Sequence, residues 1–369
     1  MYLREYIQKY KDEKLTADTF ALPDGALLSM FTLADIPNIC PTNKAIKFRD
    51  AMKKQVELHK MRRMGLILPT ALTKALYEAS QVRRYYGLKI HDVFYLVDEK
   101  ECTQSIFLQM DMIDNTTVVV FSGTDDTLIG WRENFDIVYG KRVPCLKHAV
   151  EYANKLRTDR KYIFVGHSKG GMEVLYAGLM CKPEVQKCII SINDYDGTGY
   201  PLEVLNEMKD SLALSKATLV VPNEGTVGRF FYHPINPKIV YSNELGLLQH
   251  NPLTWRIKGK DFDFVDSFTM NSESFSVMIT STPDKFTKEE LESFEKALFE
   301  DTLGVGGTTK LIEIPSKIFD IQKAFMGLSL QNKRLYLKFM KHLIEGRLIT
   351  RDMLLTTAKV KWNPFSKNK

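Results

Sequence analysis

The residues best suited to chemistry lie in the segment Gly166-His-Ser-Lys-Gly170, which has the spacing G-x-S-x-G. This spacing is typical of a tight turn between a strand and a helix, where a strained backbone exposes the serine hydroxyl group. Glycine suits both flanking positions because a side chain there would collide with the neighbouring strand or helix. The apolar run 161–165 and a helical pattern over 172–180 supply the strand and the helix. Ser168 is therefore a candidate nucleophile.

A histidine base must accompany such a serine, because the hydroxyl group alone is a weak nucleophile. In enzymes built on this turn the chain order is serine, acid, histidine. The histidines after Ser168 are His233, His250 and His342. His342 falls in a helical tail and His233 precedes the predicted strand 238–241, whereas His250 follows that strand in a loop. We favour His250, because the base belongs at the end of a strand.

The acid that orients the histidine has two main candidates. Asp196 follows the strand after the Ser168 helix and lies in a tight glycine turn, while Glu224 follows the next strand. The strand count favours Glu224. Aspartate is the commoner acid, although Asp-Gly is also an ordinary turn signature. Asp194 is a third candidate.

An oxyanion hole requires two backbone N–H groups directed at the developing charge. Lys169, directly after the nucleophile, supplies one, and Thr124, in the loop after strand 116–121, supplies the other. Four acidic residues near this loop offer oxygen ligands for a cation: Asp125, Asp126, Glu133 and Asp136. We interpret them instead as a solvated loop that caps the helix containing Trp131, and we predict no metal and no cofactor.

The surrounding elements alternate between short buried strands and helices. The strands are predicted at 92–97, 104–109, 116–121, 187–192, 217–221 and 238–241, and the helices at 143–157, 172–180 and 202–214. This alternation predicts an α/β domain with a mostly parallel central sheet flanked by helices.

After this domain, the alternation of strands and helices gives way to helical patterns. Thr287-Lys-Glu-Glu290 is a capping box that opens a helix, and Gly304–Gly307 then breaks the chain. Residues 314–358 have helical patterns only. We predict a main domain over 1–300, a Gly-rich linker over 301–310 and a basic helical C-terminal region over 311–369.

Composition narrows the protein class. The 369 residues are 44% hydrophobic and 26% charged, enough for a substantial core. The five cysteines form no CxxC pair, which argues against a disulfide framework or a zinc site and favours a reducing compartment. No secretory signal and no membrane-spanning run is visible, so we expect a cytoplasmic protein.

The net charge of +6 is concentrated in the tail. Residues 310–369 contain thirteen Lys/Arg and four Asp/Glu, a net of +9, against −3 for residues 1–309. A nucleic-acid-binding protein would spread its basic patch over the fold, so we expect no nucleic-acid partner. In the helix 333–344, one face carries Tyr336, Met340, Leu343 and Ile344. We favour packing of this face on the main domain over peripheral contact with an anionic membrane.

Four motifs in order give the chain a family resemblance: Phe121–Trp131, Gly166–Gly171, Asp196–Tyr200 and Gln249–Pro252. Over residues 15–285 the chain resembles the bacterial, lipase-like Mbeg-like family, which is akin to the class 3 lipases. The resemblance implies an α/β-hydrolase fold with Ser168 as nucleophile and His250 as base.

The same resemblance bears on the acid and the substrate. The family's Asp-Gly-Pro-Gly segment matches Asp196–Gly199 and favours Asp196, whereas class 3 lipases place the acid nearer Glu224. Ser122 stands where class 3 lipases have arginine, and Thr198 replaces the family's proline. Both departures argue against a conventional triacylglycerol substrate.

The sequence therefore predicts a serine hydrolase that cleaves a small-molecule ester or lipid through an acyl-enzyme. The alternative is a catalytically silent hydrolase scaffold used for binding.

Overall fold

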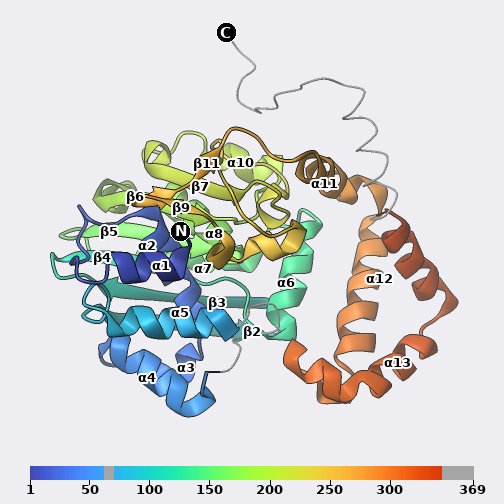
Figure 1. The fold of residues 1–369 in the computed structure, drawn as a ribbon. Coiled ribbons are helices and arrows are strands. Elements are labelled where there is room, and N and C mark those ends of the chain that lie inside the picture. Colours follow the sequence, from blue (N-terminus) through green and yellow to red (C-terminus); the bar gives the residue numbers. More distant parts are fainter. Residues whose placement is uncertain (62–69, 343–369) are drawn as a thin grey trace, which may run out of the picture.

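The computed structural model describes residues 1–61 and 70–342. Within them, the centre of the fold is a nine-stranded sheet with the order β1-β2-β3-β4-β5-β6-β7-β8-β11 (Figure 1). Its strands are β1 (Ile46–Lys47), β2 (Lys89–Asp98), β3 (Thr103–Asp111), β4 (Thr116–Phe121), β5 (Lys161–His167), β6 (Ile189–Tyr195), β7 (Ala217–Pro222), β8 (Lys238–Val240) and β11 (Phe264–Val265). A small separate sheet pairs β9 (Ile257–Lys258) with β10 (Asp261–Phe262).

The sheet is mixed, so the expectation of a mostly parallel sheet is wrong. Strands β4 to β8 pair in parallel, but β1 to β4 pair antiparallel and β11 adds antiparallel to β8. The physical reason is the length of the connections. Only the short turns 99–102 and 112–115 join β2 to β3 and β3 to β4, whereas a parallel crossover needs a dozen residues or more.

Helices cover both faces of the sheet (Figure 1). One face carries the N-terminal helices α1 (Leu3–Lys9), α2 (Leu22–Ser29), α3 (Ile36–Ile39), α4 (Phe48–His59) and α5 (Thr70–Gln81). The other carries α7 (Pro144–Ala153), α8 (Lys169–Met180), α9 (Pro183–Cys188) and α10 (Leu202–Met208). Alternate residues of β4 serve the two layers: Val118 and Val120 pack with the N-terminal helices, and Val119 and Phe121 with the others.

The remaining helices are α6 (Leu128–Val138), α11 (Met270–Thr280), α12 (Lys288–Leu298) and α13 (Ile318–Gly327), followed by a helix at 330–342. Short 3₁₀ helices are η1 (Met30–Leu33), η2 (Leu214–Lys216), η3 (Val227–Arg229), η4 (Gly246–His250), η5 (Pro252–Thr254), η6 (Thr282–Lys285), η8 (Val305–Gly307) and η9 (Leu311–Lys317), and η7 (Phe299–Leu303) is a π-helical turn.

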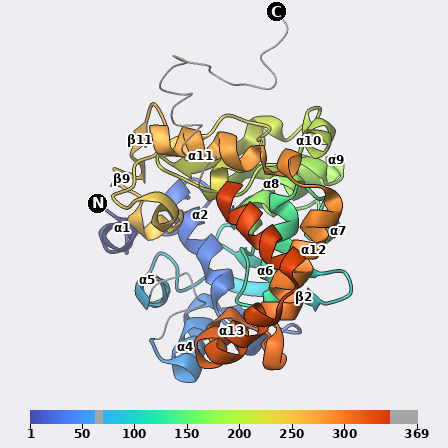
Figure 2. The same cartoon turned by 90° about the vertical axis from the view of Figure 1, so that its right-hand side faces the viewer.

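The C-terminal helices form a layer beside α6 (Figures 1 and 2). The capping box predicted at Thr287 is present and opens α12. Phe294 of α12 stacks on Phe135 of α6, and Phe339 of the last described helix stacks on Phe294. These rings, together with buried Leu335, make a third hydrophobic cluster.

The amphipathic face predicted in this last helix is only partly described. Tyr336 contacts the ring of Phe294, and Met340 is half exposed. Leu343, Ile344 and the rest of the predicted tail lie outside the described residues.

The segment after the glycine break lies against the loop that precedes α6. Lys310 forms an antiparallel bridge with Thr127. The Leu128 N–H donates to Thr309 O at 2.8 Å, and the Leu311 N–H donates to Asp126 O at 2.9 Å. Residues from the predicted linker thus reach the loop that follows β4.

Two global features concern membranes and redox chemistry. No helix in residues 1–61 and 70–342 combines the length and apolarity that crossing a bilayer requires. The five cysteines are free, and four of them are buried.

Candidate active site

Ser168 lies at the junction of β5 and α8 in a strained backbone conformation. Its φ of 62° and ψ of −128° fall in a region that residues other than glycine rarely adopt. A side chain at Gly166 would overlap the carbonyl oxygen of Gly170, and one at Gly170 would overlap that of Phe121. The close approach of β4, β5 and α8 therefore requires both glycines and holds Ser168 at the turn.

His250 ends η4 and pairs with Asp196. Its Nδ1 lies 2.7 Å from Asp196 Oδ2. Asp196 directly follows β6, where its N–H donates to Val220 O at 2.8 Å and its φ is 54°. The N–H of Gly228 donates to the other carboxylate oxygen, Oδ1, at 2.9 Å. Both oxygens of the buried carboxylate are therefore occupied, and one of them fixes the imidazole ring.

Further contacts hold the backbone of the His250 loop. His167 Nε2 donates to the carbonyl oxygen of His250 at 2.7 Å, and the two rings lie 4.4 Å apart. The indole N–H of buried Trp255 donates to Gln249 O at 2.7 Å. The sequence assigned no role to His167 or Trp255. No local pattern points to either contact, because each depends on how the chain folds back.

Burial controls the protonation of the pair. It lowers the pKa of His250 to about 4, so the ring is neutral near pH 7, the form that a general base needs. Burial raises the pKa of Asp196, and the Gly228 N–H and the Arg229 charge oppose this by favouring the carboxylate. The 2.7 Å contact suits a neutral imidazole whose Nδ1 donates to Asp196 Oδ2.

The other candidates from the sequence lie elsewhere. Glu224 Oε1 accepts from Asn271 at the surface, at 3.2 Å. Asp194 Oδ1 accepts from the Gly197 N–H at 2.8 Å. His233 Nε2 donates to Gly228 O at 3.0 Å, and His342 contacts Thr282. Of the acids considered, Asp196 is the one that contacts His250.

The two amides expected for an oxyanion hole flank Ser168. Lys169 is the first residue of α8, and Gly123, next to Thr124, lies against the backbone of His167 and the Cβ atom of Ser168. Across the part of the chain that the structure describes, neither the Lys169 N–H nor the Thr124 N–H has a hydrogen-bond acceptor. Both amides are therefore free to bind a substrate oxygen.

Ser168, His250, Thr124 and Lys169 all line one cavity of about 1370 Å³. Large apolar side chains supply much of its wall: Leu33, Tyr95, Ile106, Trp131, Phe135, Val138, Val227, Phe230, Leu247, Phe275 and Ile312. Asp35, Asn38 and His59 add a polar part, in which His59 Nε2 lies 2.7 Å from Asp35 Oδ2. No sequence motif pointed to the N-terminal residues of this wall.

The acidic residues near the Thr124 loop serve separate purposes. Asp125 accepts from the N–H of Thr127 at 2.9 Å, and Thr127 in turn caps α6. Asp126 accepts from the Ile312 N–H at 3.1 Å. Interpreting Glu133 as part of a solvated loop is wrong, because it is buried and its carboxylate lies 2.7 Å from Lys169 Nζ.

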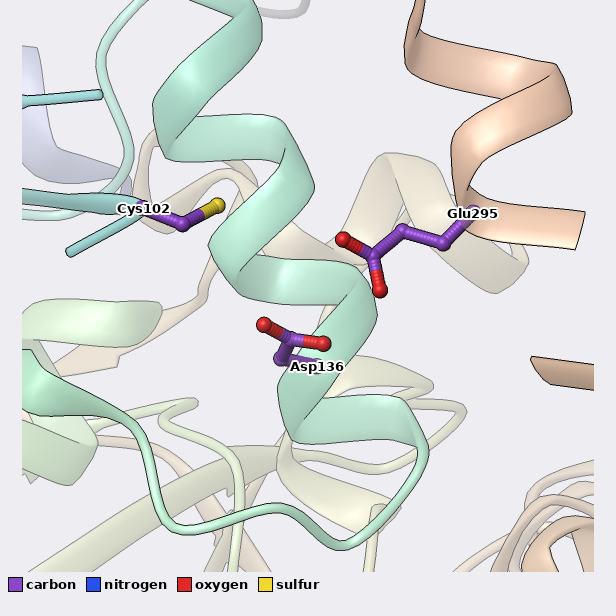
Figure 3. Close-up of side chains that lie close together, drawn as sticks. All are labelled: Cys102, Asp136 and Glu295. Carbon is purple, nitrogen blue, oxygen red and sulfur yellow. The ribbon is translucent and has the colours of Figure 1, made fainter. Parts of the chain in front are cut away.

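Asp136 belongs to a cluster with Cys102 and Glu295 (Figure 3). One ligand atom from each residue lies within 4.8 Å of the others. Lys141 already pairs with both carboxylates, and Arg132 pairs with Glu295. Burial raises the pKa of Cys102 to about 11, which keeps the thiol protonated. Because the acidic charges are compensated, we assign this cluster to the contact between α6 and α12 and not to a metal.

Comparison with known proteins gives one match. The family model described as Mbeg1-like matches residues 79–300, more than half of the chain, so the chain belongs to the Mbeg1-like family. No curated protein and no solved structure matches significantly.

Proposed function

We propose that this member of the Mbeg1-like family is a serine hydrolase that cleaves carboxylic esters on an α/β-hydrolase fold. One observation carries the proposal. Ser168, on its strained turn, lines the same cavity as His250, and His250 is hydrogen-bonded to the buried Asp196. Along the chain these residues occur in the order serine, acid, histidine, as in this enzyme class.

In the proposed reaction, Ser168 Oγ attacks the ester carbonyl carbon while its proton passes to His250 Nε2. Asp196 stabilises the imidazolium that forms. The Lys169 and Thr124 N–H groups stabilise the negative charge on the carbonyl oxygen. His250 then returns the proton to the departing alcohol oxygen, which leaves an acyl-enzyme. A water molecule, activated by His250, releases the acid and restores Ser168.

The character of the cavity supports an ester with a long apolar group. Its volume of about 1370 Å³ exceeds that of common small-ligand pockets, which hold roughly 300–1,000 Å³. Aromatic and aliphatic side chains dominate its wall, among them Trp131, Phe230 and Phe275. We expect kcat/KM to rise with acyl chain length in a series of p-nitrophenyl esters, because longer chains bury more apolar surface.

Labelling and turnover test the proposal together. We expect a fluorophosphonate probe to label the protein and p-nitrophenyl esters to be hydrolysed. Ser168→Ala should abolish labelling and lower kcat by more than about 10³-fold. Ser316→Ala, at an exposed serine that does not line the cavity, is the matched control and should retain both activities.

Two outcomes would contradict the proposal. Undiminished hydrolysis by Ser168→Ala would place the reaction at another residue. A folded parent protein that is neither labelled nor active would favour the binding scaffold.

A further inference from the structure

We propose that Gln104 is a positioning residue. Together with Lys169 and Glu133, it fixes the relative positions of the Lys169 and Thr124 N–H groups, the two amides proposed for the oxyanion hole. These three buried residues, the Lys169 cluster, do not belong to the Ser168, His250 and Asp196 set, and of the three only Lys169 lines the cavity. The inference rests on the proposed function, because it assigns a role within the same reaction.

The Lys169 side chain is buried although it carries a charge. Its ammonium group donates to Glu133 Oε2 at 2.7 Å, to Gln104 Oε1 at 3.0 Å and to the backbone oxygen of Gln104. These contacts occupy all three N–H donors of the ammonium group. The Lys169 side chain therefore has no donor left for a substrate, and it acts by fixing the first residue of α8, whose backbone N–H faces the oxyanion site.

Glu133 of α6 completes the anchor. Its two oxygens accept from Thr103 Oγ1 at 2.6 Å, from the Gln104 N–H at 3.0 Å and from the Cys145 N–H at 3.2 Å, in addition to Lys169. Burial would raise the pKa of Glu133, but the Lys169 charge and these hydrogen bonds bring it below its usual value. The carboxylate is thus ionised and joins α6, β3 and α8.

Gln104 connects this anchor to the second amide. Its side-chain oxygen, Oε1, accepts from Lys169 Nζ and also from the Asp125 N–H at 3.3 Å. Asp125 directly follows Thr124. The Gln104 side-chain oxygen is therefore bonded both to Lys169 and to the residue next to Thr124. Gly130 of α6 packs closely against both residues. A Cβ atom at Gly130 would come within 3.2 Å of Gln104 Oε1 and 3.1 Å of Thr124 Cγ2.

A purely structural role explains this cluster poorly. A buried ion pair is a weak source of stability, and an apolar side chain of similar size can fill such a space as well. What the Lys169 charge adds is a defined orientation of the Gln104 side chain. The ammonium group draws the Gln104 carbonyl to one orientation, and that orientation fixes the Asp125 N–H relative to Lys169. Oxyanion stabilisation depends on such pre-set geometry.

The test replaces Gln104 by methionine, which keeps the shape but removes the acceptor oxygen. We expect kcat for a p-nitrophenyl ester to fall by about tenfold or more with KM within about twofold, because only the charged transition state uses these amides. Gln109→Met is the matched control. Gln109 lies on the same strand, β3, and does not line the cavity, so its replacement should leave kcat unchanged.

Rescue separates positioning from packing. Gln104→Glu keeps the acceptor oxygens and should recover most of the loss in kcat. If Gln104→Met does not fold, as judged by circular dichroism, the double variant Lys169→Met with Glu133→Gln removes the same link while leaving no unpaired charge. It should show the same loss of kcat.

Three outcomes would overturn the inference: unchanged kcat in a folded Gln104→Met or double variant, a loss carried by KM alone, or no rescue by Gln104→Glu. Failure of the proposed function has a different signature, because the parent protein itself would then be unlabelled by fluorophosphonate.

Discussion

Asp196 and Glu224 show how environment separates two acids of the same charge. The Asp196 carboxylate is buried, accepts from the Gly228 N–H and contacts His250. Glu224 keeps its carboxylate at the surface beside Asn271, and only its backbone N–H faces the His250 loop, where Gln249 accepts it at 2.8 Å. An acid orients an imidazole only if its own position is fixed, which favours Asp196.

At this residue scale, we expect Asp196→Asn to lower kcat by about 10³- to 10⁴-fold, because an amide cannot hold the imidazole in the required tautomer. Glu224→Gln is the matched control and should change kcat by less than about twofold. Steady-state kinetics with a p-nitrophenyl ester measures both. A large loss in Glu224→Gln with an active Asp196→Asn would reverse the assignment.

Helix α6 links several parts of the site. Thr127 caps its first turn by accepting from the Gly130 N–H at 3.1 Å, and Thr124 Oγ1 donates to Asn134 at 2.9 Å in the next turn. Glu133 on the same helix anchors Lys169. Movement of α6 would therefore move the Thr124 loop, in which we propose one of the oxyanion amides.

The N-terminal caps of helices α6 and α11 allow a matched comparison. Thr127→Ala should cost about 1 kcal/mol of unfolding free energy through loss of the α6 cap, and it should also lower kcat severalfold. Thr269→Ala removes the equivalent cap of α11, where Thr269 accepts from the Ser272 N–H. It should cost a similar free energy and leave kcat unchanged, because Thr269 does not contact the Thr124 loop. Urea unfolding and steady-state kinetics measure the two effects, and equal losses of kcat would contradict the role of α6.

In the whole molecule, the C-terminal helices are joined to the α/β layers by both apolar and polar contacts. Phe135 and Tyr139 near the end of α6 share a cluster with Phe294 and Phe339, while Glu295 pairs with Arg132 and Lys141. Ile312 and Lys310 also line the cavity. We therefore expect these helices to unfold together with the rest of the protein.

Two phenylalanines of the C-terminal helices differ strongly in solvent exposure. Phe339 is 9% exposed and Phe319 is 82% exposed. Phe339→Ala should cost about 3–5 kcal/mol of unfolding free energy by leaving a cavity between helices, whereas Phe319→Ala should cost less than about 0.5 kcal/mol. Thermal unfolding should give one shifted transition for Phe339→Ala. A separate early transition would show instead that the C-terminal helices unfold independently.

Peripheral contact of the basic tail with an anionic membrane stays the less favoured alternative to packing on the main domain. The half-exposed Met340 belongs to the face in question, but the other apolar residues proposed for it, Leu343 and Ile344, lie outside the described residues.

Local sequence patterns predicted the elements that local physics controls. Strand β4 has the predicted bounds, and the capping box opens α12 as expected. Strand β6 begins at Ile189, two residues later than predicted, because the short helix α9 extends to Cys188. The layer of N-terminal helices was not predicted. Three of its helices, α1, α2 and α3, are short, and helices of that length depend on burial against the sheet for their stability.

The turn at Ser168 could be predicted from the residues alone, because steric exclusion at Gly166 and Gly170 acts over a few residues. The same reasoning narrowed the candidates for base and acid to a few residues. It takes the complete fold to show that Asp196, and not Glu224, contacts His250, and that Gln104 joins Lys169 to the Thr124 loop. These pairings connect distant parts of the chain. They depend on strand order, sheet register and burial, which no spacing within a motif can specify.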